Sequence, residues 1–212
     1  KVAVIGYPGS ADGGVTLTLS DVVYDGMIFN PEANLLLASR GNLRIESPLP
    51  LLTEEDLSLN ADGDIAINQS ITANHISITA DAHSNYWNGG GEGSGSISQA
   101  GNTIITSSEL MLSAATGIGS SINPLETQVS SLQATNTTSG DINITNTGDL
   151  IVTSVLNSTP NGTVLLIASG SIFDDENDAT RITADNIKLT AGDNIGNFIS
   201  EPLNFAPMLD VA

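Results

Sequence analysis

Two stretches of eleven residues, LLLASRGNLRI at 35–45 and LSLNADGDIAI at 57–67, share one pattern and lie 22 residues apart. In each, two apolar residues stand two positions apart, a glycine follows, and a second apolar pair closes the stretch. Alternation with period two is typical of short β-strands, and glycine between two such runs favours a turn. So short a repeat without a helix pattern predicts a solenoid of stacked coils.

The second apolar pair recurs along most of the chain. Its first member is found at Leu43, Ile65, Ile97, Ile118, Ile142, Val164, Ile187 and Leu209, and its second member falls on Leu189 and Val211 in the last two coils. Five of the eight positions have glycine two residues earlier, where a turn needs a permissive backbone. A further strand start recurs at Leu150, Ile172 and Ile195. The spacing predicts an all-β, parallel β-helix with about 22 residues and about three short strands per coil.

One internal likeness conflicts with this ladder. The segment SELMLSAATGIGSSINPL at 108–125 resembles DNIKLTAGDNIGNFISEPL at 185–203, and the offset of about 77 residues is close to three and a half coils. Either the motif recurs on a different face of the solenoid, or the register slips between residues 112 and 142. Both readings keep the solenoid, but they assign the faces differently.

The gap between Ile65 and Ile97 holds ten residues more than one coil needs. Within it lies DAHSNYWNGGGEGSG at 81–95, which we interpret as an insertion at one corner of a continuous solenoid. Function concentrates in surface loops on rigid scaffolds, so His83, Tyr86 and Trp87 are candidate ligand-binding residues for a sugar ring or a protein pocket. The alternatives are a mobile glycine-rich tip and a tryptophan that folds over the next coil.

Composition limits the partners. The formal net charge is −19, from 24 acidic and 5 basic residues, and this disfavours nucleic acid and anionic membrane surfaces. There is no cysteine, and the apolar runs are far shorter than the roughly 20 residues that span a bilayer. The chain begins with Lys and shows no signal-peptide pattern, so we expect residues 1–212 to be one β-helix segment of a longer protein, with less regular coils at 1–34.

An acidic run, FDDENDAT at 173–180, offers the one candidate metal site. Calcium prefers carboxylate oxygens, and the run supplies Asp174, Asp175, Glu176 and Asp178. Their spacing matches no recognised calcium loop, so a solvated acidic corner is the alternative. No other cofactor is expected.

The histidine in HISI at 75–78 is predicted to point outwards, because it alternates with the apolar residues Ile76 and Ile78.

GDINITNTGDLIV at 140–152, NIKLTAGDNIG at 186–196 and the Ile-Gly pair followed by Pro-Leu resemble repeats of filamentous-haemagglutinin-like large exoproteins. These are surface adhesins of Gram-negative bacteria exported by two-partner secretion, and the likeness covers most of residues 35–212. It implies a right-handed parallel β-helix, secreted or held at the cell surface. The resemblance also implies two kinds of partner: adjoining coils of the same long chain, and a glycan or protein on the surface of a host or neighbouring cell. Some such adhesins are glycosylated, and Asn-x-Ser/Thr sequons occur here at Asn68, Asn136, Asn143, Asn157 and Asn161.

The parallel β-helix fold also occurs in polysaccharide lyases and glycoside hydrolases. An enzyme of one of these two classes is therefore the alternative to an adhesin segment. A lyase needs basic residues near the substrate carboxylates, but the sequence shows no cluster among its five: Lys1, Arg40, Arg44, Arg181 and Lys188. A hydrolase needs two carboxylates across the scissile bond, and the acidic residues here fall in predicted turns without long loops to wall a groove. We therefore expect a non-enzymatic adhesin segment that acts as a stalk, as a binding surface, or as both.

Overall fold

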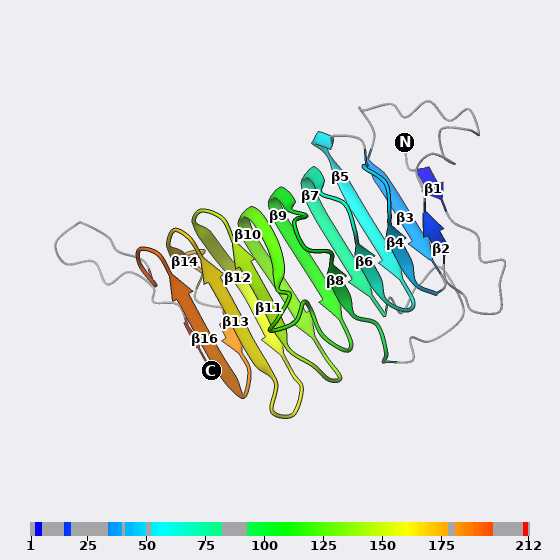
Figure 1. Ribbon diagram of the computed structural model, residues 1–212. Coiled ribbons are helices and arrows are strands. Elements are labelled where there is room, and N and C mark those ends of the chain that lie inside the picture. The colour runs from blue at the N-terminus through cyan, green and yellow to red at the C-terminus, as the bar shows by residue number, and fades with distance from the viewer. Residues whose placement is uncertain are drawn as a thin grey trace.

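The computed structural model describes residues 3–5, 15–17, 34–39, 41–49, 52–81, 93–177, 181–196 and 210–211. Over these residues the chain is a solenoid of about six turns with about 22 residues per coil, and its strands pair in parallel (Figure 1). The predicted all-β parallel β-helix is therefore confirmed. The described residues contain no helix, and hence none with the length and hydropathy to cross a membrane.

The strands fall on three faces. Face A contains β2 (Val15–Leu17), β4 (Leu43–Ile45), β6 (Ile65–Ile67), β8 (Ile97–Gln99), β11 (Ile142–Asn146), β13 (Thr163–Ala168) and β16 (Asn186–Ala191). Faces B and C share the long strands β5 (Leu52–Ala61), β7 (Ile71–Ala80), β9 (Ile105–Ala114), β10 (Leu125–Asn136) and β12 (Leu150–Asn157). The first residues of β10 also pair with β11 on face A. Face B also has β14 (Ile172–Asp174), and face C has β1 (Ala3–Ile5), β3 (Leu35–Ser39), β15 (Arg181–Thr183) and β17 (Asp210–Val211).

A long strand covers two faces because it bends within its length. In β7 the buried positions are Ile71 and Ala73 on face B, then Ile76, Ile78 and Ala80 on face C. The step from 73 to 76 is three residues instead of two, and the same step occurs in β9, β10 and β12. Two successive outward residues at that step turn the chain from one face to the next, so three faces need only two strands.

The ladder read from the sequence is a real column of paired residues. Parallel pairs on face A link Leu43, Ile65, Ile97, Ile118, Ile142, Val164 and Ile187 in order. The second predicted column is also confirmed, because Leu150 pairs with Ile172 and Ile172 with Ile195.

The last coil of the ladder was predicted wrongly. Val211 pairs with Ile182 on face C and does not follow Leu189 on face A, while Leu209 lies outside the described residues. All three faces have the same in–out alternation, so a spacing near 22 residues does not by itself decide which face a strand joins.

The 77-residue likeness is explained by a change of face, without a slip of register. Ile118 lies on face A between Ile97 and Ile142, whereas its counterpart Ile195 pairs with Ile172 on face B. Leu110 pairs on face C with Leu132, whereas its counterpart Ile187 pairs on face A with Val164. The same motif thus forms two different parts of a coil.

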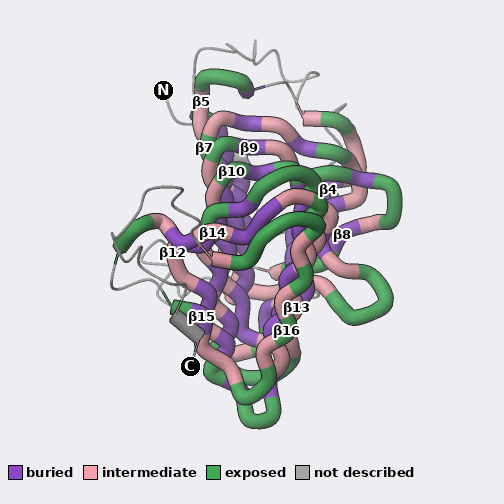
Figure 2. Tube along the Cα trace, turned by 90° about the vertical axis from the view of Figure 1, so that its left-hand side faces the viewer, coloured by how far each residue is buried: buried purple, intermediate pink, exposed green. Residues whose placement is uncertain are grey.

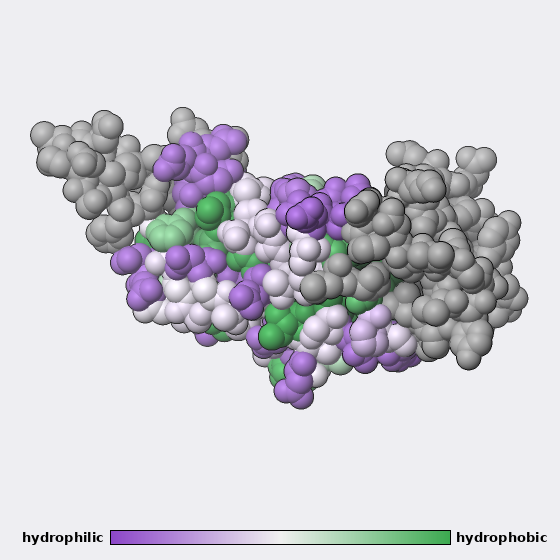
Figure 3. All heavy atoms as spheres, turned by 90° about the horizontal axis from the view of Figure 1, so that it is seen from above, coloured by the Kyte–Doolittle hydropathy of each residue, from purple (hydrophilic) through white to green (hydrophobic). Residues whose placement is uncertain are grey.

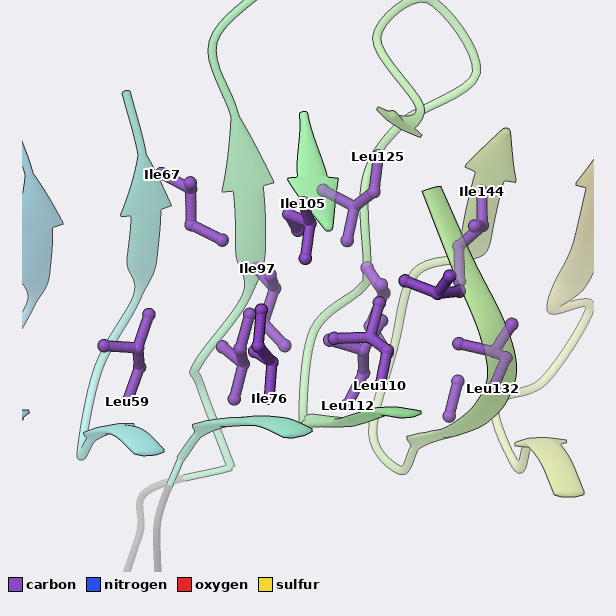
Figure 4. Close-up of a cluster of buried hydrophobic side chains, with 14 of the residues drawn as sticks. Leu59, Ile67, Ile76, Ile97, Ile105, Leu110, Leu112, Leu125, Leu132 and Ile144 are labelled. Atoms are coloured by element: carbon purple, nitrogen blue, oxygen red, sulfur yellow. The ribbon is translucent and has the colours of Figure 1, made fainter. Parts of the chain in front are cut away.

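The interior is aliphatic, as the low aromatic content requires. Inward side chains from all three faces meet in one cluster that includes Leu59, Ile76, Ile97 and Leu132, each at most 1% exposed (Figure 4). Figure 2 looks along the stack and shows buried residues along the inside, with exposed residues concentrated at the turns. Each fully buried Leu or Ile stabilises the fold by about 1.5–3 kcal/mol relative to an exposed one. Stability is therefore contributed coil by coil.

Two different constraints require glycine at the turn positions that precede the face A column. Gly140 has φ of 84°, the left-handed conformation that the sequence pattern suggested. Gly95 has no such φ, but a Cβ there would collide with the backbone of Ala80 and Asp81 in the preceding coil. Glycine is therefore required at some turns by a left-handed backbone conformation and at others by the close approach of the preceding coil.

Across the 32-residue spacing between Ile65 and Ile97, the strands of face A still pair directly. Ile65 pairs directly with Ile97, and Ile67 with Gln99, although 32 residues separate the members of each pair. Asp81 ends the part of the chain described before the gap at 82–92, and its Oδ1 accepts a hydrogen bond from Gly93 N at 3.1 Å where the described chain resumes. The two ends of the gap thus meet at one corner.

Candidate binding groove

Corner carboxylates and amides hold successive coils together. Asp64 Oδ1 accepts Ser96 N at 2.9 Å, Asp141 Oδ1 accepts Thr163 N at 2.8 Å, and Asp149 Oδ1 accepts Ser171 N at 2.7 Å. Asn42 Oδ1 accepts Asp64 N at 2.8 Å in the same way. Each bond reaches from one coil to the next, so part of the strongly acidic composition is explained by structure. Charge-assisted bonds of this type to backbone N–H groups are among the stronger ones.

The acidic run makes local turn contacts. Asp174 Oδ1 accepts Glu176 N at 2.9 Å, and Asp175 Oδ1 accepts Asn177 N at 3.0 Å. Asp174 occupies an inward position of β14 and is only 6% exposed. Burial raises the pKa of its carboxyl above the usual 3.8, and the hydrogen bond with Asp175 acts in the same direction.

The predicted calcium ligands are only partly described. Asp174, Asp175 and Glu176 follow one another at the end of β14, whereas Asp178 lies outside the described residues. Among the residues that the structure describes, no three His, Asp or Glu side chains gather closely enough to hold a metal ion.

The insertion residues His83, Tyr86 and Trp87 also lie outside the described part of the chain. Their predicted role in ligand binding therefore stays a prediction. The other histidine is described: the His75 side chain is 49% exposed, as alternation predicted, and its Nδ1 lies 2.7 Å from Asp56 Oδ1.

A shallow groove with a volume of about 620 Å³ crosses the outer side of face B. Its floor is formed by outward residues at equivalent positions of successive long strands. Thr72 of β7 pairs with Thr106 of β9, which pairs with Gln128 of β10. Beside this row, Ser108 Oγ donates a hydrogen bond to Asn74 Oδ1 at 3.4 Å. The floor is thus a repeated set of neutral hydroxyl and amide groups.

The C-terminal end of the groove has a different character. Ile151 of β12 pairs with Phe173 of β14, and both side chains line the groove. Ile151 is 37% exposed, although most large aliphatic side chains of the described chain are buried. Figure 3 shows hydrophobic residues on one face as separate patches between hydrophilic and neutral ones. The groove therefore combines a polar floor with a small apolar platform.

A buried asparagine builds this end of the groove. Between Asn146 and Leu150 the chain leaves the sheet in a turn that brings Thr147 and Asp149 to the groove. The Asn146 side chain occupies the gap: its Oδ1 accepts Val129 N at 2.9 Å, and its Nδ2 donates to Val129 O at 3.2 Å. It also donates to Asp149 O at 3.0 Å. One amide thus replaces the missing strand pair and positions the turn.

The charged groups needed for polysaccharide cleavage are not gathered in the groove. Of the described residues that line it, only Asp149 carries a carboxylate, and none is basic. Arg44 lies on β4, where it forms an ion pair of 2.8 Å with Glu46. Lys188 lies on β16, six coil steps further along face A, or about 30 Å away at the usual strand spacing.

Neither the groove nor the buried asparagines were predicted from the sequence. Asn136, Asn143, Asn146 and Asn157 are each at most 3% exposed, so three of the five sequons place their asparagine in the interior. A lone asparagine reads as a turn residue, and no pattern marks it as buried. The groove did leave a signal: Ser, Thr, Asn or Gln recurs at equivalent outward positions of β7, β9 and β10.

No protein-family model matches the chain, and neither does any curated protein or any solved structure. The resemblance to large-exoprotein repeats therefore stays a prediction, and the groove is the site whose geometry is most fully described.

Proposed function

We propose that this chain is a non-enzymatic segment of a large bacterial surface adhesin, located outside the cell and acting as stalk and binding surface. The observation that carries the proposal is the column of paired residues on face A, which runs through the described coils from β2 to β16. A solenoid of this kind gains length by adding coils, and each coil contacts only its neighbours. Such a rod suits the task of holding a binding surface away from a cell.

Two further observations support a binding role over catalysis. The corner carboxylates Asp64, Asp141 and Asp149 are engaged in bonds between coils, and Asp149 is the only carboxylate among the described residues that line the groove. Glycoside hydrolysis typically uses two carboxyl groups about 5–9.5 Å apart across the scissile bond. The partner we propose is a glycan or protein on a host or neighbouring cell.

The test is binding of the 212-residue chain to intact cells and to a glycan panel, with release of reducing ends measured in parallel. A variant with residues 83–94 replaced by a short Gly-Ser turn reports on His83, Tyr86 and Trp87. Binding without cleavage is the expected result, and its loss in the loop variant would assign recognition to the insertion. Cleavage of a polysaccharide would overturn the proposal in favour of a β-helical lyase or hydrolase.

A further inference from the structure

We propose that the groove on face B binds a neutral glycan chain lying along the solenoid axis. This inference deepens the proposed function and rests on it, because it names the ligand class and the surface through which a non-enzymatic rod would bind. The insertion at 81–95 is a separate candidate, since Asp81 follows the far end of β7 from Thr72. The two positions are nine residues apart in number, which corresponds to about 25–30 Å of extended chain.

The length of the groove favours a chain over a single sugar. Its lining residues come from six successive coils, from Thr53 of β5 to Phe173 of β14. Five coil spacings correspond to about 24 Å. The groove is open and shallow along this length, so an extended polymer can contact every coil, whereas a small ligand would leave most of its surface in water.

The chemistry of the floor suits hydroxyl groups. Thr72, Thr106, Asn74, Ser108 and Gln128 offer both donors and acceptors, and none of them is charged. They repeat with the coil spacing, so successive sugar units of one chain would meet similar groups. Ile151 and Phe173 provide an apolar platform at one end for the C–H face of a sugar ring.

Charge selects against acidic polymers. The one carboxylate that lines the groove, Asp149, accepts a hydrogen bond from Ser171 N, and no lysine or arginine lines it among the described residues. An anionic glycan would therefore find no counter-charge there and would be repelled by a chain with a net charge of −19.

A peptide strand fits this surface poorly. The groove lies on the outer side of the paired strands β7, β9 and β10, and it does not lie at an edge. Their backbone N–H and C=O groups already pair with neighbouring coils, so a peptide could not add as a further strand there.

The experiment is affinity electrophoresis of the 212-residue chain in gels that contain galactomannan or hydroxyethylcellulose, with polygalacturonate as the anionic comparison. The first variant is Thr106→Arg, which places a long side chain at the centre of the floor. Its matched control is Ser98→Arg, at an exposed outward position on face A. The second variant is Ile151→Asn, and its control is Met111→Asn, since Met111 is similarly exposed (41% against 37%) but points outward from face C. Thermal melts confirm that all four variants fold.

We expect a neutral polymer to retard the wild-type chain and polygalacturonate to leave it unretarded. Thr106→Arg and Ile151→Asn should each weaken binding by about tenfold, and the two controls should bind like wild type. The inference is overturned if no neutral polymer retards the wild type, if polygalacturonate retards it more strongly, or if both groove variants bind normally.

The gels, together with the reducing-end assay, separate this inference from the proposed function. If only the replacement of residues 83–94 abolishes binding, the chain is an adhesin segment and the groove is not its site. If the chain binds a neutral polymer through the groove and also releases reducing ends, the groove inference stands and the non-enzymatic role fails.

Discussion

The coils before residue 115 and the coils after residue 135 satisfy the same backbone at their corners in different ways. Before residue 115, no buried asparagine occurs among the described residues. After residue 135, three buried asparagines make side-chain hydrogen bonds to backbone groups: Asn136 with Gly117 N, Asn146 with Val129 N and Asn157 with Thr163 O. A buried amide can therefore bond to backbone groups where a coil leaves the sheet, as Asn146 does at one end of the groove.

The largest expected effect is that of Asn146→Ala. This change removes the partners of Val129 N and Val129 O, and Val129 is only 5% exposed. A buried backbone group left without a partner costs about 1–3 kcal/mol, so we expect the free energy of unfolding to fall by about 3 kcal/mol. Urea denaturation measures it. Asn60→Ala, at an outward position of β5, is the matched control and should change stability by less than about 0.5 kcal/mol. Equal effects of the two changes would show that the amide does not replace a strand pair.

In the coils before residue 115, we expect the turns that approach a neighbouring coil closely to be the most sensitive to substitution. Gly95→Ala places a methyl group against the backbone of Ala80 and Asp81, which cannot move without disturbing the neighbouring coil. We expect a loss of about 2 kcal/mol, as is typical of overpacking. Gly101→Ala is the control, since a Cβ there has no neighbour within 4 Å, and alanine costs less entropy on folding. The comparison is wrong if both alanines are tolerated equally in thermal melts.

A double-mutant cycle on Asn136 and Asn157 tests whether the buried amides at this corner act as one network. Asn136 Nδ2 donates to Asn157 Oδ1 at 3.0 Å, and both amides bond to Gly140 O from neighbouring coils. Residues that share one buried network do not act additively. We expect the two alanine changes to interact by about 1–2 kcal/mol in equilibrium denaturation. Strict additivity would mean that each amide acts alone, and the corner would then not be a network.

The parts of the fold that could be predicted from sequence are those that depend on apolar periodicity. The column from Leu43 to Ile187 follows from a spacing near 22 residues, because most large aliphatic residues of the described chain point inward. The assignment of Val211 failed because periodicity fixes which side of a strand is buried but not which face the strand joins.

The parts that could not be predicted depend on polar residues. Asn146 and Asn157 are indistinguishable in sequence from the many asparagines of exposed turns, and only the backbone groups around them decide their burial. The site residues predicted at 81–95 belong to the one stretch whose composition differs clearly from the rest of the sequence. The groove, by contrast, is built from ordinary Ser, Thr, Asn and Gln residues whose positions become equivalent only once the coils are stacked.

The smallest expected effect is a gain of stability at Asp174, a buried acid among the coils after residue 135. Burial raises the pKa of its carboxyl above 3.8, so the unfolded chain loses this proton at a lower pH than the folded chain does. The folded state is therefore least penalised below pH 3.8, and its stability falls as the pH rises through the raised pKa. Asp174→Asn keeps an acceptor for Glu176 N but cannot ionise. We expect it to melt at a higher temperature than wild type at neutral pH, with the difference shrinking as the pH falls towards 3.8. A difference that does not depend on pH in melts from pH 3 to 7 would mean that the carboxylate is solvated in the folded chain.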